Sequence, residues 1–231
     1  MAAAHPLDRP VWTTLTTRQA PLAEGDARAW RLKADYGLFA AAADGSAESL
    51  AALANLVPAD GQLATVGTAE PGPPPGLNAE PHLVWQMVCE ALTPAPPGNF
   101  DIVDLTDADA AQLLALATLT KPGPFFARTH QLGAFVGIKD ASGRLLAMAG
   151  ERMNPPGFTE VSGVCTQPDQ RGRGYAGALM RVVAGRIANR GETAFLHSYA
   201  HNAGAIALYE SLGFALRAQV TMTVLSRRQR A

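Results

Sequence analysis

Residues 164–191 read VCTQPDQRGRGYAGALMRVVAGRIANRG and contain the clearest structural signal in the chain. The residues from Thr159 onward predict a strand that ends at Thr166, and Pro168 forces an extended turn after it. A helix over about residues 174–189 follows. Its predicted apolar face consists of Ala178, Leu179, Val182, Val183 and Ile187. The stretch is therefore a strand, a glycine-containing loop and a helix in direct succession.

The loop before this helix is suited to binding a phosphate. Gly172 and Gly174 lack a Cβ, so the backbone can adopt positive φ and approach a ligand closely. The N–H groups of residues 172–176 lie at an open helix end and form an anion-binding site, to which Arg171 and Arg173 add positive charge. An ordinary glycine turn is the alternative interpretation. One other phosphate loop is excluded, because the chain has no GxxxxGK[ST] motif.

The remainder of the C-terminal part alternates strands with helices. Thr106 or Asp107 is the expected N-cap of one helix, and the polar turn DASGR at residues 140–144 predicts a hairpin. The predicted strands cover residues 102–105, 135–139, 145–151, 159–166 and 193–199, with closing strands within 214–226, and the other helices cover 107–119 and 203–212. This order predicts an α/β fold with a mixed sheet.

Two proline-rich runs separate this part from the N-terminal part. They are EPGPPPGLNAEP at residues 70–81 and TPAPPG at residues 93–98, and both favour extended or turning chain. The apolar segment HLVWQMVCEAL between them predicts a strand. We therefore place a boundary at Gly98, which gives domains of residues 1–98 and 99–231.

The N-terminal domain gives fewer signals. A helix is predicted over residues 47–56 and a strand over residues 62–66, whereas residues 21–37 show no clear pattern. No cluster of reactive side chains is recognisable in this domain.

Composition limits the partners. The 231 residues carry a formal charge of -1 from 19 basic and 20 acidic side chains, so no global field attracts nucleic acid or an anionic membrane. Cys89 and Cys165 lie far apart, which argues against a disulfide framework or a zinc site. No apolar run reaches about 18 residues, and the N-terminus lacks a signal-peptide pattern. We expect a cytoplasmic monomer or homodimer without a metal.

The phosphate loop also resembles a known family. The run Arg171-Gly172-Arg173-Gly174-Tyr175-Ala176 is similar to the R/Q-x-x-G-x-G/A motif of the GNAT superfamily, whose backbone amides hold the pyrophosphate of coenzyme A. The resemblance covers roughly residues 100–226. It is closest to the glycine N-acyltransferase-like branch, whose members often carry a divergent, non-catalytic N-terminal half. A degenerate copy of the same fold is one interpretation of that half here.

The resemblance implies an N-acetyltransferase. Acetyl-CoA, or a related acyl-CoA, would donate the acyl group directly to an amine acceptor in a ternary complex. The backbone of Val164, Cys165 and Thr166 would bind the thioester carbonyl and the pantetheine arm, where this strand splays from the strand at residues 193–199. Attack by an amine creates an oxyanion, which a preorganised backbone N–H can stabilise.

Two residues of the run HNAGAIALYESLGF take roles from the same resemblance. Asn202 would hydrogen-bond the pantetheine arm, and Tyr209 would protonate the departing CoA thiolate. The two residues are seven apart, so they share one face of a helix. A plain N-cap for Asn202 and a half-buried aromatic for Tyr209 are the alternative interpretations.

A general base is also needed, because an amine with a pKa near 10 is protonated at pH 7. Glu160 occupies the place of the catalytic glutamate in histone-type GNAT enzymes. The period of two puts Glu160, Ser162 and Val164 on one strand face, from which a carboxylate could face the thioester. A solvated charge at the strand end is the alternative, and Glu151 is the reserve candidate.

Other reactive residues receive weaker assignments. His197, Tyr199 and His201 could share a face that lines the acceptor cleft, but their spacing lacks the glutamate of HExxH, so metal binding is not expected. Cys165 is expected in the core rather than as a nucleophile. The acceptor would be selected by the N-terminal half together with Phe125, Phe126 and Thr129. An acyl-CoA-binding regulator without turnover is the alternative function.

Overall fold

The predicted strand, loop and helix at residues 164–191 are present in the computed structural model, which describes residues 5–94 and 100–228 of the chain. Eight strands form one sheet in the order β4-β11-β5-β10-β9-β8-β7-β6, and β1, β2 and β3 form a second, small sheet. The strands are β1 Ala23–Asp26, β2 Ala29–Leu32, β3 Ala40–Ala42, β4 Gln62–Gly67, β5 Leu77–Cys89, β6 Ile102–Leu105, β7 Phe135–Lys139, β8 Leu145–Glu151, β9 Phe158–Thr166, β10 Thr193–Tyr199 and β11 Ala215–Arg227. The α-helices are α1 Pro10–Leu15, α2 Ala47–Leu56, α3 Ala110–Thr120, α4 Tyr175–Asn189 and α5 Ala203–Ser211.

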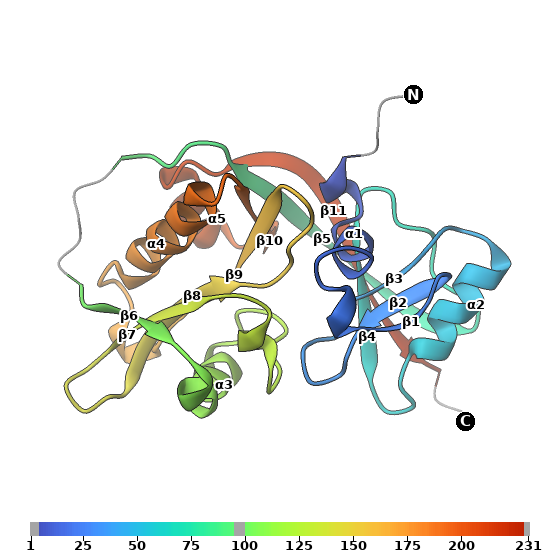
Figure 1. The fold of residues 1–231 in the computed structure, drawn as a ribbon, viewed down its shortest axis with the longest axis horizontal. Helices are drawn as coiled ribbons and strands as arrows, with labels where there is room; N and C mark the ends of the chain where they lie inside the picture. The colour runs from blue at the N-terminus through green and yellow to red at the C-terminus, as the bar shows by residue number, and fades with distance from the viewer. Residues whose placement is uncertain (1–4, 95–99, 229–231) are drawn as a thin grey trace.

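These elements form two lobes (Figure 1). The N-lobe contains α1, α2 and β1 to β4, and the C-lobe contains β6 to β10 with α3, α4 and α5. In the C-lobe, α4 packs against Val136 and Ile138 of β7, whereas α3 packs against Phe135 of the same strand. Because neighbouring strand residues point to opposite faces, the two helices cover opposite faces of the sheet. The α/β prediction with a mixed sheet is therefore confirmed.

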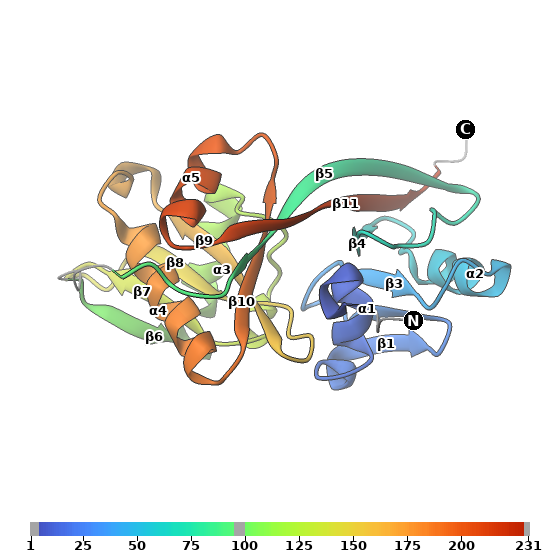
Figure 2. The same cartoon turned by 90° about the horizontal axis from the view of Figure 1, so that it is seen from above.

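A long antiparallel ribbon of β5 and β11 connects the lobes (Figure 2). At its C-lobe end β5 pairs with β10, and at its N-lobe end β11 pairs with β4. Pro81 lies within β5, although extended or turning chain rather than a sheet interior was predicted there, and it pairs with Thr223. It is tolerated because β10 pairs with β5 only from Val84 to Cys89, so β5 has a single neighbour at Pro81. One long strand with a bulge near Leu216 replaces the predicted closing strands.

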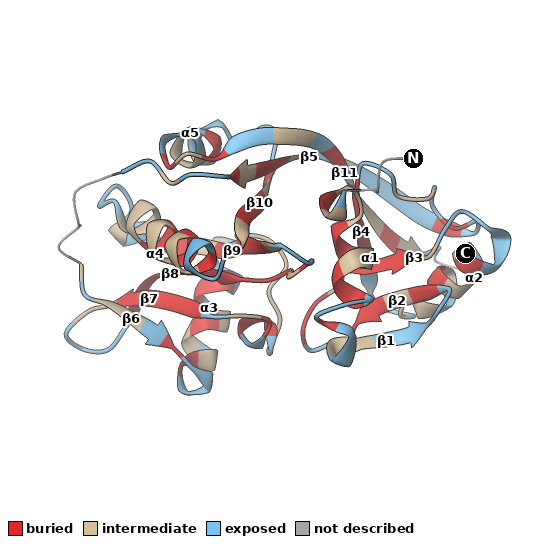
Figure 3. Ribbon diagram, turned by 45° about the horizontal axis from the view of Figure 1, so that its top comes forward, coloured by how far each residue is buried: buried red, intermediate tan, exposed pale blue. Residues whose placement is uncertain are grey.

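Most other predicted elements match the structure closely. The helix α2 has the predicted bounds, and Thr106 forms a capping box with Asp109 ahead of α3. The elements before residue 47 were not predicted, because β1 and β2 have four residues each and β3 consists of alanine alone. Figure 3 shows the buried residues gathered on the C-lobe strands and on the inner faces of the helices. No helix among the described residues is long and apolar enough to cross a membrane.

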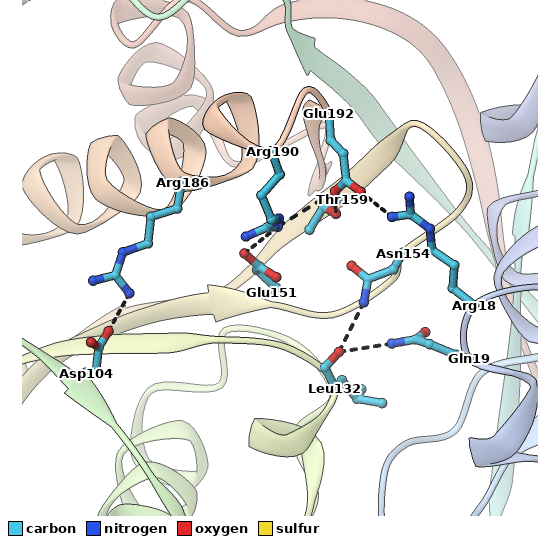
Figure 4. A network of polar contacts seen from close by, with 10 residues as sticks. All are labelled: Arg18, Gln19, Asp104, Leu132, Glu151, Asn154, Thr159, Arg186, Arg190 and Glu192. Atoms are coloured by element: carbon cyan, nitrogen blue, oxygen red, sulfur yellow. Dashed lines mark hydrogen bonds and ion pairs between the residues drawn. The ribbon is translucent and has the colours of Figure 1, made fainter.

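Polar contacts join the lobes. The side-chain amide of Gln19 donates to the carbonyl oxygens of Leu132 and Arg152, at 3.1 and 2.7 Å. Close by, Arg18 pairs with Glu192, which also accepts from Thr159 at 2.6 Å (Figure 4). Two cations stack on aromatic rings across the same boundary, Arg128 on Tyr36 and Arg152 on Phe39, each 4.7 Å from the ring centroid.

The domain boundary at Gly98 lies outside the described residues and stays a prediction. The strands on its two sides are nevertheless hydrogen-bonded to each other, because β4 and β5 precede it and their partners β10 and β11 follow it.

We therefore expect the two halves to stay together when the chain is cut at that boundary. A site-specific protease sequence inserted after Gly98 should be cleaved without separating the fragments, since the paired strands share one core. Size-exclusion chromatography should show both fragments in one peak. Two separate folded peaks would contradict this expectation.

Candidate active site

Strand β9 opens the candidate site, because it leaves its neighbour β10. The two strands pair in parallel only from Phe158 to Glu160, opposite Thr193 to Phe195, and the rest of β9 has no partner on β10. On its other side β9 pairs with β8, but Gly163 and Val164 together oppose the single residue Ala149. Gly163 has φ 64°, as expected for a bulge built on glycine. The predicted splay of these strands is therefore present.

One cleft lies over the phosphate loop, and we call it the loop cleft. It has a volume of about 380 Å³. Its walls include Val164, Cys165 and Thr166 of β9, residues 170–176, Asn202 and Tyr209. The structure therefore brings together all the residues that were predicted to hold the coenzyme. Lys121, at the end of α3, also lines this cleft and was missed by the sequence analysis.

The loop has the backbone conformation that its glycines predicted. Gly172 and Gly174 have φ 78° and 81°, and no side chain caps the first turn of α4. The backbone N–H groups of residues 172–176 have no hydrogen-bond partner among the described residues. Arg171 and Arg173 are exposed and form no ion pair within the described parts of the chain. The loop can thus offer unpaired donors and two cations to an anion.

A second cavity lies between the lobes, and we call it the interlobe cavity. Its volume is about 100 Å³. Its apolar wall contains Phe39, Val66, Val84 and Met222, and its polar wall contains Arg152, Ser162, His197 and Ser198. Pro122, Val164, Tyr199, Asn202 and Tyr209 line both this cavity and the loop cleft. The two spaces therefore meet at the bulge of β9 and at the face of α5.

Helix α5 presents Asn202 and Tyr209 to that junction. The Asn202 Oδ1 accepts from the backbone N–H of Ala205 at 3.3 Å, so the N-cap interpretation is confirmed, while the side chain also lines both spaces. Burial raises the pKa of Tyr209 above its usual value near 10. The phenol therefore holds its proton at neutral pH.

Glu160 is enclosed rather than solvated. Its side chain is 0% exposed, and both its oxygens accept from Arg152, at 2.7 and 2.8 Å. Burial alone would raise its pKa, but the charge and hydrogen bonds of Arg152, together with His197, lower the pKa to about 2. The predicted common face with Ser162 and Val164 is not available to it. Arg152 covers the carboxylate, and the bulge at Gly163 interrupts the alternation of β9.

A chain of hydrogen bonds continues from Glu160 into the N-lobe. His197 Nδ1 lies 2.8 Å from Glu160, and His197 Nε2 lies 3.1 Å from the side-chain nitrogen of Gln86. The Gln86 oxygen accepts from Arg217 at 2.6 Å, so its nitrogen is the donor toward His197. The Nε2 atom of His197 is therefore the acceptor, and its Nδ1 atom is the donor toward Glu160. Arg217 also pairs with Asp8 at 2.6 Å.

The other predicted residues lie outside the junction. Glu151 pairs with Arg190 at 2.9 Å in the network of Figure 4 and lines neither space. Phe125 packs on Phe135, and Thr129 is buried against the Tyr36 carbonyl. His201 and Phe126 line neither space, and His201 stacks on Tyr199.

Cys165 is buried, and burial raises the pKa of its thiol to about 11. At neutral pH the group is therefore a thiol rather than a nucleophilic thiolate. No cluster of potential metal ligands occurs among residues 5–94 and 100–228.

Comparison with known proteins gives consistent matches. A family model described as FR47-like protein matches residues 135–223. The crystal structure of an acetyltransferase described as belonging to the GNAT family, from Novosphingobium aromaticivorans, is 43% identical and has a TM-score of 0.87 over 98% of this chain and 100% of that chain. No curated protein matches the sequence.

Two more distant structures share the fold alone. A GCN5-related N-acetyltransferase from Kribbella flavida is 17% identical, with a TM-score of 0.69 over 98% of each chain. A GCN5-related N-acetyltransferase-like protein from Streptococcus suis is 15% identical, with a TM-score of 0.60 over 94% of this chain and 92% of that chain.

The buried pair predicts a large effect of Glu160→Gln on stability. The change leaves the Arg152 charge without its partner, which should cost about 3–5 kcal/mol in urea unfolding at pH 7. Since folding lowers the pKa of Glu160 from 4.5 to about 2, its contribution is complete above pH 4.5 and is lost as the pH falls toward 2. The gap between the two proteins should therefore close over that range.

Asp26→Asn is the matched control, because Asp26 pairs with Arg28 on the surface. It should leave the urea midpoint nearly unchanged at pH 7. Equal effects of the two substitutions would contradict the structural role of the buried pair.

Proposed function

Because this chain belongs to the GNAT family of acetyltransferases, we propose that it transfers an acetyl or another acyl group from acyl-CoA to an amine held in the interlobe cavity. The observation that carries this proposal is the junction of two spaces, one built on an open helix N-terminus and the other on side chains of both lobes. Acyl-CoA supplies a thioester, which is an activated acyl group.

The loop cleft fits the donor. A pyrophosphate is matched by the unpaired N–H groups of residues 172–176 and by the charges of Arg171 and Arg173. A Cβ on Gly172 would meet no other atom of the described residues within 4 Å, and the φ of 78° also favours glycine there. The backbone of Val164, Cys165 and Thr166, with the Asn202 amide, is available for the rest of the coenzyme.

The bulge of β9 supplies the electrostatic part of the mechanism. Gly163 and Val164 face one residue of β8, so the ladder between the two strands is interrupted where the spaces meet. We propose that a backbone N–H freed there stabilises the negative charge that develops on the acyl oxygen. Fixed backbone dipoles need no reorganisation during the reaction, which makes them effective catalysts.

Tyr209 is the proposed general acid. It lies at the junction, and its raised pKa keeps the phenol protonated until the leaving sulfur requires a proton. Cys165 stays a thiol, which supports direct transfer from donor to amine.

Glu160 is assigned a positioning role instead of the role of a base. Its pKa of about 2 makes it a poor proton acceptor, and both nitrogens of His197 are already hydrogen-bonded. The amine therefore loses its proton to solvent water before it attacks. The pKa of the amine itself, rather than that of a carboxylate, would then set the limb of the pH profile along which the rate rises with pH.

The finer family assignment is also a proposal. A place in the glycine N-acyltransferase-like branch is supported by the N-lobe that packs beside the catalytic lobe. We propose that residues 1–98 are non-catalytic. Their described side chains help to line the interlobe cavity, and none of them lines the loop cleft that would hold the acyl donor.

The substitution Gly172→Ala tests the donor site. A Cβ would project from the phosphate loop, and an L residue is strained at φ 78°. Acetyl-CoA affinity, measured by calorimetry, should fall about tenfold or more, because one charged hydrogen bond is worth about 1.5–3 kcal/mol. Gly143→Ala is the control, since Gly143 has φ 85°, equally open surroundings and a place in a remote turn. Equal loss of affinity in both variants would show that strain alone is responsible.

The substitution Tyr209→Phe tests turnover. Release of CoA in the presence of an amine panel should slow about 100-fold or more, while acetyl-CoA affinity stays within error. Tyr36→Phe, which removes a hydroxyl outside both spaces, should leave the rate unchanged. Tight acetyl-CoA binding without CoA release on any amine, and no effect of Tyr209→Phe, would instead favour a regulator that binds acyl-CoA without turnover.

A further inference from the structure

Arg152 is the charged side chain that lines the interlobe cavity while being 9% exposed. Its Nε and Nη2 atoms donate to Glu160, and its Nη1 atom has no hydrogen-bond partner among the described residues. A guanidinium carries five N–H donors in a fixed fork. The Nη1 atom is not among the fully buried atoms that lack a partner in the described part of the chain, so it is accessible, and Arg152 lines the cavity. The free side of the fork can therefore donate to an oxygen atom of a molecule in the cavity.

The chemistry of the walls narrows the choice of that ligand. A planar carboxylate matches a guanidinium better than a single oxygen does. Arg152 is paired with Glu160 and Arg217 with Asp8, so these two ion pairs beside the cavity carry no net charge. A zwitterion of zero net charge suits such a site. A polyamine does not, because no aspartate or glutamate lines the cavity.

Another part of the wall is apolar and belongs to the N-lobe and the ribbon. Phe39, Val66 and Met222 are each buried and face the same cavity as Arg152. The cavity of about 100 Å³ is small beside the loop cleft of about 380 Å³, which favours a small molecule over a polypeptide.

The geometry points to an α-amino acid with an apolar side chain as the acceptor, which rests on the proposed function. Its carboxylate lies on Arg152, its side chain lies against Phe39, Val66 and Met222, and its amine faces the junction at Val164 and Tyr209. An N–C bond forms between the amine nitrogen and the acyl carbon as the C–S bond breaks. Tyr209 gives its proton to the sulfur and is reprotonated from solvent. The nitrogen releases two protons to solvent, one from the ammonium before attack and one as the amide forms, so the reaction releases one proton in total. The products are an N-acyl amino acid and CoA.

A series of related acceptors tests the contact with Arg152 and the contact with the apolar wall separately. With acetyl-CoA, leucine should have a kcat/KM about 100-fold above 3-methylbutylamine, which is leucine without its carboxylate, because a buried charged hydrogen bond is lost. Leucine should also exceed glycine about tenfold or more, because glycine leaves the apolar wall uncovered. Spermidine and a leucine-initiated tripeptide serve as the polycation and the polypeptide terminus.

Two variants report on the walls. Arg152→Lys keeps the charge beside Glu160 but loses the fork, and it should raise KM for leucine by a larger factor than KM for 3-methylbutylamine. Phe39→Ala enlarges the apolar wall and should shift preference from leucine toward tryptophan. If Arg152→Lys fails to fold, the acceptor series on the unmodified enzyme decides alone.

Calorimetry with acetyl-CoA distinguishes the two ways to fail. If acetyl-CoA binds but leucine is not acylated, the amino-acid acceptor is overturned and the donor site stands. The same holds if acetyl-CoA binds and 3-methylbutylamine, glycine, spermidine or the peptide is acylated as well as leucine or better. Absence of acetyl-CoA binding overturns the proposed function itself, and the acceptor proposal with it.

Discussion

The parting of β9 from β10 is the constraint on which the rest of the structure depends. These strands share only three pairs of residues, whereas β10 keeps β5 as its other neighbour from Ala194 to Tyr199. The ribbon of β5 and β11 leads away from the C-lobe and carries the pairing toward the second lobe. A continuous ladder between β9 and β10 would close both the loop cleft and the interlobe cavity. The open site thus depends on the early end of the β9 pairing, while the pairing with β5 on the other side of β10 leads toward the second lobe.

A buried polar chain fixes the geometry across that opening. It runs from Asp8 through Arg217, Gln86 and His197 to Glu160 and ends at Arg152. Burying so many polar groups is costly unless each finds its partner, and here every link is 3.1 Å or shorter. Asp8 and Arg217 lie outside the C-lobe sheet, so the orientation of Arg152 depends on the packing of both lobes. Such a network specifies one arrangement more strictly than apolar packing would.

The sequence predicted the parts of the fold that are encoded locally. The loop at residues 171–176, the helix α4 and the cap at Asn202 follow from residues that are adjacent in the chain. The bulge had a local signal as well, because Gly163 interrupts a predicted strand. The burial of Glu160 had none, since strand periodicity names a face but does not say that Arg152 covers it. Gln86 likewise gave no signal, because its importance arises from a partner 111 residues away.

The same distinction separates the two sides of the proposed reaction. The donor side is a contiguous segment from Val164 to Ala176 plus one helix, so its chemistry can be recognised from a single sequence. The acceptor side is assembled from Phe39, Val66, Arg152 and Met222, which meet only after the ribbon has brought the lobes together. Side chains in such an assembly can change one at a time without disturbing the phosphate loop. A shared donor site combined with a divergent N-lobe is therefore a physical route by which relatives with one fold could select different amines.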